Sequence, residues 1–167
     1  MASKVLIVMG SDSDLDQLLP GVDALKELGI PVEVTVASAH RSPDRVIALA
    51  KAAREKGFGV VLAAAGGAAH LAGVFAANTT LPVVAVPIAI GTLGGVDSLL
   101  SSVQMPGGVP IASVGIGSGR NAGLFAAAIL SSSDPALAAR LDAFRTRQAA
   151  KVVDADAKVQ TKLAGRT

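Results

Sequence analysis

The sequence predicts an α/β fold, in which helices cover both faces of a parallel sheet. Two observations lead to this prediction. Five short runs rich in Val and Ile alternate with longer segments of helical pattern, and the runs carry apolar residues on both faces. Such runs are typical of strands inside a parallel sheet, and their alternation with helices is the rhythm of βαβ units.

The elements follow in order along the chain. The predicted strands are Lys4–Met9, Val32–Val36, Val60–Ala65, Val83–Pro87 and Ile111–Ile116. The segments between the first four strands are long enough for crossover helices, namely Asp14–Leu28, Pro43–Lys56 and Ala69–Asn78. The strand count predicts a three-layer, doubly wound, flavodoxin-like sheet.

Helix ends are marked by residues suited to them. Ser42-Pro43 reads as an N-cap followed by a proline at the first helical position, where the missing N–H costs nothing. Gly29 and Gly57 stand where C-terminal caps belong.

A second cap-and-proline pair, Asp134-Pro135, starts an Ala-rich helix that we expect over about 135–163. Leu137, Leu141 and Phe144 fall on one stripe of this helix. With no further strand to cover, the stripe is predicted to pack on a neighbouring subunit. Residues 1–167 are expected to form one domain with a core over about 4–132 and this helix at its end.

Composition limits the classes of function. Only 17% of residues are charged, against about 25% in an ordinary soluble domain, which suggests that part of the surface faces other copies. Residues 140–166 hold seven basic and three acidic residues. This basic segment could contact nucleic acid, but its interleaved acids and alanines favour a solvated helix face. The chain has no cysteine, which excludes disulfides and thiolate chemistry and fits a reducing compartment.

Targeting signals are not evident. The N-terminal apolar run is too short for a signal peptide. The segment Gly59–Ala77 has the length of a membrane span, but His70 and the Gly66-Gly67 pair favour a strand, a tight turn and a helix.

Polar or glycine-rich segments follow the first four predicted strands. In an open parallel sheet, ligands bind outside the carboxyl ends of the strands, so these segments are expected to meet at one site. Both histidines of the chain lie among them. The segments are GSDSD (Gly10–Asp14), SAHRS (Ser38–Ser42), AGGAAH (Ala65–His70) and PIAIGTLGG (Pro87–Gly95).

The first two of these segments suit an anionic ligand. Ser11 and Ser13 offer hydroxyls beside backbone N–H groups at a helix N-terminus, and Arg41 can pair with a phosphate through two N–H groups. A surface salt bridge is the alternative role of Arg41. Asp14 either caps the helix or accepts hydrogen bonds from ribose hydroxyls, and the two roles are compatible.

His40 is the candidate catalyst, because imidazole titrates near neutrality and moves a proton in either direction. An inert loop histidine is the alternative. His70 stands near a helix start, where the dipole disfavours the charged ring, so it suits hydrogen bonding better than acid catalysis.

Several known sites do not match. There is no GxxxxGK[ST] phosphate loop, and GSGRNA (Gly117–Ala122) resembles a dinucleotide motif but follows the last strand. A phosphoacceptor aspartate is missing where Ala65-Gly66 stands, and the sequence has no Trp or Tyr to stack on a flavin. Two histidines without a third ligand argue against a metal centre.

Taken together, five segments resemble the PurE family of purine biosynthesis, and specifically its class I form, the bacterial N5-carboxyaminoimidazole ribonucleotide (N5-CAIR) mutases. The segments are VMGSDSD, SAHRSPDR, AAAGGAAHLAGV, LPVVAVPI and GVDSLLSSVQMPGGVPIASVGIG. The likeness covers about residues 4–132. The sequence differs from the pattern expected of the family at residues 89–95 and 115–123.

The resemblance implies a cytoplasmic mutase without metal or cofactor, which moves a carboxylate from the exocyclic N5 to C4 of the imidazole in IMP biosynthesis. The alternative is the class II reaction, direct carboxylation of aminoimidazole ribonucleotide (AIR) by CO2. The resemblance also implies a homo-octamer with active sites between subunits, to which Asp97–Gly108 contributes. Hand-over of substrate from the N5-CAIR synthetase stays a hypothesis, and neither nucleic acid nor membrane is an expected partner.

The resemblance also assigns residues. The family's general acid and base falls on His40, and its phosphate and ribose ligands fall on Ser11, Asp14 and Arg41. The remaining positions that match its pocket are Ser13, Ser38, Gly66, Ala69, His70 and Leu71.

Overall fold

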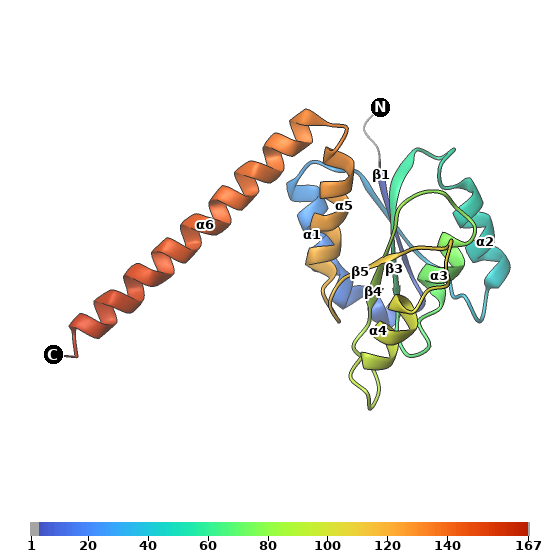
Figure 1. The fold of residues 1–167 in the computed structure, drawn as a ribbon, viewed down its shortest axis with the longest axis horizontal. Coiled ribbons are helices and arrows are strands. Elements are labelled where there is room, and N and C mark those ends of the chain that lie inside the picture. Colours follow the sequence, from blue (N-terminus) through green and yellow to red (C-terminus); the bar gives the residue numbers. More distant parts are fainter. Residues whose placement is uncertain (1–3, 167) are drawn as a thin grey trace.

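The computed structural model describes residues 4–166, so residues 1–3 and 167 of the predicted domain lie outside the described part (Figure 1). Its core is a parallel sheet in the order β2-β1-β3-β4-β5. This is the flavodoxin-like order, and it confirms the predicted fold class. The strands are β1 (Lys4–Met9), β2 (Val32–Val36), β3 (Phe58–Ala65), β4 (Val83–Pro87) and β5 (Ala112–Ser113).

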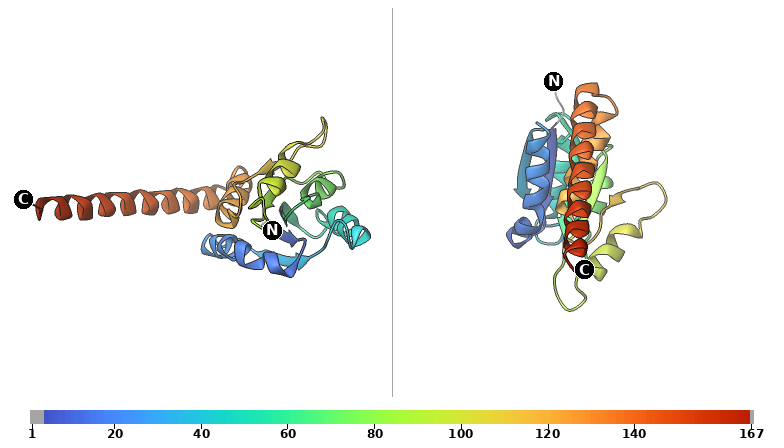
Figure 2. Two further views of the ribbon diagram at one scale, coloured as in Figure 1. Left: turned by 90° about the horizontal axis from the view of Figure 1, so that it is seen from below. Right: turned by 90° about the vertical axis from the view of Figure 1, so that its left-hand side faces the viewer.

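Helices cover both faces of the sheet (Figures 1 and 2). Along β1, Val5 and Ile7 point toward α1 and α5, whereas Leu6 and Val8 point toward α2 and α3. This alternation follows from the two-residue period of a strand and divides the interior into two apolar clusters. The helices are α1 (Leu15–Glu27), α2 (Pro43–Ala52), α3 (Leu71–Ala76), α4 (Val96–Val103), α5 (Gly119–Ser131) and α6 (Pro135–Ala164), with a 3₁₀ turn at Asp12–Asp14.

The central strands match the sequence pattern closely, but the sheet edges do not. β2 was expected to be buried on both faces, yet it lies at an edge, and Val34 and Val36 are each more than 40% exposed. β5 is paired over two residues only, Ala112 with Val84 and Ser113 with Ala85, because the chain turns soon afterwards, between Gly115 and Ser118. The helices α4 and α5 were not predicted, since their glycine- and serine-rich sequences hide the helical pattern.

α1 and α5 approach each other through glycines. A Cβ on Gly119 would lie 2.1 Å from the carbonyl oxygen of Gln17, and one on Gly21 would lie 2.4 Å from that of Gly119. A Cβ on Gly123 would likewise lie 2.6 Å from the carbonyl oxygen of Gly21. The apparent dinucleotide motif around Gly119 therefore serves close helix packing, which is the reason its glycines are needed.

α6 begins as predicted, with the Asp134 carboxylate accepting from the N–H of Leu137 and Pro135 in the first turn. The prediction that Leu137, Leu141 and Phe144 pack on another subunit is wrong. All three are buried in the apolar cluster that α1, α5 and the sheet share, because the first turns of α6 pack on α5. Beyond them the helix projects from the molecule as a long arm (Figure 2).

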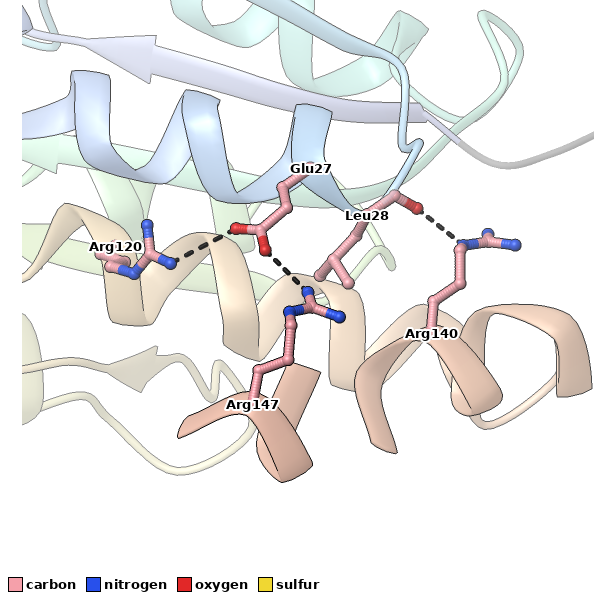
Figure 3. Close-up of polar contacts among 5 residues, drawn as sticks. All are labelled: Glu27, Leu28, Arg120, Arg140 and Arg147. Carbon is pink, nitrogen blue, oxygen red and sulfur yellow. Dashed lines mark hydrogen bonds and ion pairs between the residues drawn. The ribbon is translucent and has the colours of Figure 1, made fainter. Parts of the chain in front are cut away.

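Polar contacts fix the start of this arm (Figure 3). The Glu27 carboxylate lies 2.8 Å from the Arg147 guanidinium and 3.4 Å from that of Arg120. Arg140 donates to the carbonyl of Leu28 at 2.8 Å. Both Arg120 and Arg147 also stand over the ring of Phe144, 5.5 and 5.8 Å from its centroid, so the arm leaves the core at a defined angle.

The candidate membrane segment resolves into strand, turn and helix. Residues 59–65 belong to β3, Gly67 has a φ of +63°, and α3 starts at Leu71, as expected. Among the described residues, no helix combines the length and the apolar character that crossing a bilayer requires.

Candidate active site

The turn after β1 is organised by a capping box. The Asp14 carboxylate accepts from the Ser11 N–H at 3.0 Å, and the Ser11 hydroxyl accepts from the Ser13 N–H and the Ser13 hydroxyl. Asp14 is only 3% exposed, whereas the two serines reach the surface. Asp14 makes no side-chain capping bond to α1, so the capping role considered for it is not the one observed; it completes the Ser11 capping box of the 3₁₀ turn, which fixes both hydroxyls at the carboxyl end of β1.

Burial raises the pKa of Asp14 above its ordinary value of 3.8, against the hydrogen bonds from Ser11 and Ser13, which favour the carboxylate. The Arg41 guanidinium reaches this turn from the next loop and donates to the carbonyl oxygen of Gly10 at 3.1 Å. Arg41 takes part in none of the ion pairs found among residues 4–166. The hydrogen bond from Arg41 to Gly10, and not a salt bridge, therefore connects the two loops.

The loop after β2 is closed by its two serines. The Ser42 hydroxyl accepts from the Ser38 N–H at 3.0 Å and donates to the Ser38 carbonyl, while the Ser38 hydroxyl accepts from the Arg41 N–H. Ser42 precedes Pro43 at the start of α2 as predicted, but its side chain makes no capping bond to the helix. The exchange of bonds instead holds the turn that presents His40 and Arg41.

His40 and His70 face each other across the site. The His40 Nε2 and the His70 Nδ1 are 2.8 Å apart, and the two rings meet edge to face at 84°. Because a hydrogen bond needs one donor and one acceptor, only one of these two nitrogens carries a proton when both rings are neutral. The two histidines that the sequence places on separate loops thus share one proton.

The loop that carries His70 is anchored by a residue that the sequence reading missed. The Ser101 hydroxyl lies 3.1 Å from the Ala69 N–H, which donates to it, and 3.2 Å from the Gly67 carbonyl oxygen. Ser101 belongs to α4, and nothing local in its sequence marks it as a support for a distant loop.

These loops enclose a cavity of about 380 Å³ at the carboxyl ends of β1, β2 and β3. All of the nominated residues line it except Ala69, which is 3% exposed and lies behind the wall. The predicted convergence of the loops is confirmed. The lining residues are Gly10, Ser11, Ser13, Asp14, Ser38, Ala39, His40, Arg41, Ala65, Gly66, Ala68, His70, Leu71 and Ile90.

The wall divides into a polar and an apolar part. The serines, Asp14 and Arg41 lie in the segments that follow β1 and β2. The end of β3 and the segments that follow β3 and β4 contribute the apolar residues Ala65, Ala68, Leu71 and Ile90. Ile90 was not singled out from the sequence. Within residues 4–166, no three His, Cys, Asp or Glu side chains gather closely enough to hold a metal ion. The cavity can thus bind an anionic, hydroxyl-bearing ligand at one side and shelter an apolar or uncharged species at the other.

Comparison with known proteins gives this arrangement its context. The family model described as AIR carboxylase matches residues 4–151. The chain belongs to the AIR carboxylase family.

Named members of this family are similar in sequence to this protein along most of its length. The chain is 50% identical over 163 residues to a Mycobacterium tuberculosis protein named N5-carboxyaminoimidazole ribonucleotide mutase, covering 98% of this chain and 93% of that one. A Bacillus subtilis protein of the same name is 54% identical over 144 residues, covering 85% and 89%. The predicted relationship to the PurE family is confirmed.

Solved structures of the family share the fold. Treponema denticola PurE is 28% identical, with a TM-score of 0.83 over 93% of this chain and 98% of that chain. A variant of PurE2 from the same organism is 27% identical, with a TM-score of 0.85 over 95% and 98%.

Proposed function

We propose that the chain is an N5-CAIR mutase, which moves the carboxylate of its substrate from the exocyclic N5 to C4 of the imidazole by decarboxylation and recarboxylation. The observation that carries the proposal is the position of His40, on the wall of a cavity with one anion-binding and one apolar side, in a chain half identical to proteins of that name. We infer a cytoplasmic enzyme of IMP biosynthesis that needs neither metal nor cofactor and uses residues 1–167 as one domain.

The polar side of the cavity supports the placement of the ribonucleotide. Arg41, Ser11 and Ser13 supply N–H and O–H donors for the phosphate, and Asp14 supplies acceptors for the ribose hydroxyls. Ser38 and the wall formed by Gly66, His70 and Leu71 then lie toward the base. Ala69 contributes through its backbone, since its side chain lies behind this wall.

His40 serves first as the acid. The protonated ring donates to N5 of the substrate, the N–C bond to the carboxylate breaks, and its electron pair stays on nitrogen. The products of this step are CO2 and AIR, both held in the cavity. The hydrogen bond to His70 orients the His40 ring for this transfer.

His40 then serves as the base. C4 of AIR attacks the trapped CO2 and forms the new C–C bond, and neutral His40 removes the C4 proton to restore the aromatic ring. One proton enters at N5 and one leaves from C4, so the ring ends in its starting state. The apolar wall keeps water from the intermediate pair.

Exposed apolar side chains support assembly with further copies, and we propose the octamer. Beyond Phe144, no described residue of α6 belongs to either apolar cluster of the core, and Val152, Val153, Val159 and Leu163 are each more than half exposed. A lone helical arm is marginally stable in water, so packing on a second copy would stabilise it. Light scattering in solution tests this, and a monomer would contradict it.

The enzymatic proposal is tested by converting N5-CAIR to the C4-carboxylated isomer without added bicarbonate, followed by ultraviolet absorbance. Wild type should convert rapidly, whereas His40→Asn should bind nucleotide and fail to turn over. Product formed only from AIR and CO2 would instead establish direct carboxylation, and no product by either route would leave a nucleotide-binding protein.

A further inference from the structure

The loop that joins β4 to α4, residues 88–95, contributes Ile90 to the cavity wall. It lies at the carboxyl edge of the sheet (Figure 1) and begins with a backbone bond from the Ile88 N–H to the Ala65 carbonyl. All three of its glycines, Gly91, Gly94 and Gly95, have positive φ values between 57° and 91°. The loop can therefore follow a path that few other sequences would adopt.

Two side chains, among the described residues, bond to the backbone of this loop. The Ser98 hydroxyl, fully buried, donates to the Ile88 carbonyl at 3.1 Å. Gln17 of α1 accepts from the Ala89 N–H at 3.0 Å and donates to the Ala89 carbonyl at 3.4 Å. Gln17 thus binds both polar groups of one residue that is 72 positions away.

The residue after this anchor lies at the rim of the cavity. Ile90 lines the cavity and is 46% exposed, so it stands between the apolar part of the cavity and solvent. Its Cδ1 lies only 2.3 Å from the place that a Cβ on residue 66 would occupy. Because Gly66 has no side chain, Ile90 can rest against the backbone at the end of β3.

The rest of the loop lacks such support. Leu93 is 61% exposed and does not line the cavity, and the bonds within residues 91–96 are backbone turns. The position of Ile90 therefore depends on the anchors that precede it, and Gln17 is the nearer of the two.

We propose that Ile90 is the apolar gate that retains CO2 in the cavity, and that Gln17 is the positioning residue that holds this gate against Gly66. The inference rests on the proposed mutase function and adds to it two residues outside the proton-transfer machinery. CO2 is uncharged and small, so a polar site cannot hold it by charge, and a closed apolar wall must retain it instead. When the wall opens, water enters and CO2 leaves before C4 attacks it.

The experiment measures how much of the AIR and CO2 formed in the cavity escapes before C4 is carboxylated. N5-CAIR is supplied with ¹³C-labelled bicarbonate and carbonic anhydrase, and both the AIR released and the label in the C4-carboxylated product are determined by mass spectrometry. The variants are Ile90→Ala and Gln17→Met, and the matched control is Leu93→Ala, which truncates an exposed apolar side chain on the same loop.

Wild type and Leu93→Ala should release little AIR and incorporate little label. Ile90→Ala and Gln17→Met should each raise both quantities several-fold and lower kcat on the order of tenfold, with KM changed less than about twofold, because the nucleotide contacts remain. The double variant should match the single ones, since both changes open the same wall.

If both variants release no more AIR and incorporate no more label than wild type, the proposal is overturned. If AIR release and label incorporation rise in Ile90→Ala but not in a Gln17→Met variant that circular dichroism shows to be folded, the role of Gln17 is overturned. A wild-type protein that forms no product would instead refute the mutase function itself, so the two failures are distinguishable.

Discussion

Replacing Gly119 by alanine should destabilise the protein strongly, although the change adds a single methyl group. The new Cβ would lie 2.1 Å from the carbonyl oxygen of Gln17 and 3.0 Å from the Cα of Leu18. Both atoms belong to the backbone of α1, which is held against the sheet by Leu18, Val22 and Leu25. Neither can rotate away as the end of a long side chain could.

The magnitude follows from this geometry. Ordinary contact requires α5 to retreat from α1 by about 1 Å, and overpacking of this kind costs about 1–3 kcal/mol or more. Because the obstacle is backbone, we expect the upper end of that range, about 3 kcal/mol. Alanine is a better helix former than glycine by up to about 1 kcal/mol, which offsets part of the loss. The net cost of about 2 kcal/mol corresponds to a melting temperature about 4–8 °C lower in a chain of this size.

The assay is thermal unfolding followed by far-ultraviolet circular dichroism at one protein concentration, because assembly makes stability depend on concentration. Gly107→Ala is the matched control, since nothing lies within 4 Å of the place that its new methyl group would occupy and its φ is not positive. This control should be neutral or more stable by up to about 1 kcal/mol. Melting temperatures of the two variants that agree within about 1 °C would refute the close-packing argument.

Three further predictions concern the charged groups and the cavity wall. Contact with Arg147 lowers the pKa of Glu27 below its ordinary value of 4.5, so the advantage of wild type over Glu27→Gln in urea unfolding should be present above that pH and vanish as the pH falls; a constant difference would contradict this. Burial raises the pKa of Asp14 above 3.8, so in the same experiment Asp14→Asn should gain on wild type as the pH rises from about 3 to 6, and the opposite slope would count against it. Gly66→Ala should displace Ile90 and lower kcat on the order of tenfold, and the double variant with Ile90→Ala should lose no more than either single variant because both changes open the same wall; losses that multiply would exclude this contact as the cause.

The candidate site could be nominated from the sequence because its parts are local signals. His40, Arg41 and the serines around them follow strands recognisable by their Val and Ile content, and parallel strands bring their carboxyl ends to one edge. Ala69 was nominated with them by its place in a motif, but it is buried and does not line the cavity. Motif position identifies the loop, whereas the direction of each side chain depends on the backbone path.

The sequence by itself determined the order of the five strands, the helices between the first four of them, the caps at Gly29 and Asp134, and the loops on which the two histidines stand. Each of these depends on neighbours within a few positions of the chain. Only the tertiary structure decided which strands form the edges, that Leu137, Leu141 and Phe144 pack on their own core, and that Gln17 meets Ala89. Those contacts join segments far apart in the chain, and a residue's own neighbours carry no information about the partner that folding brings to it.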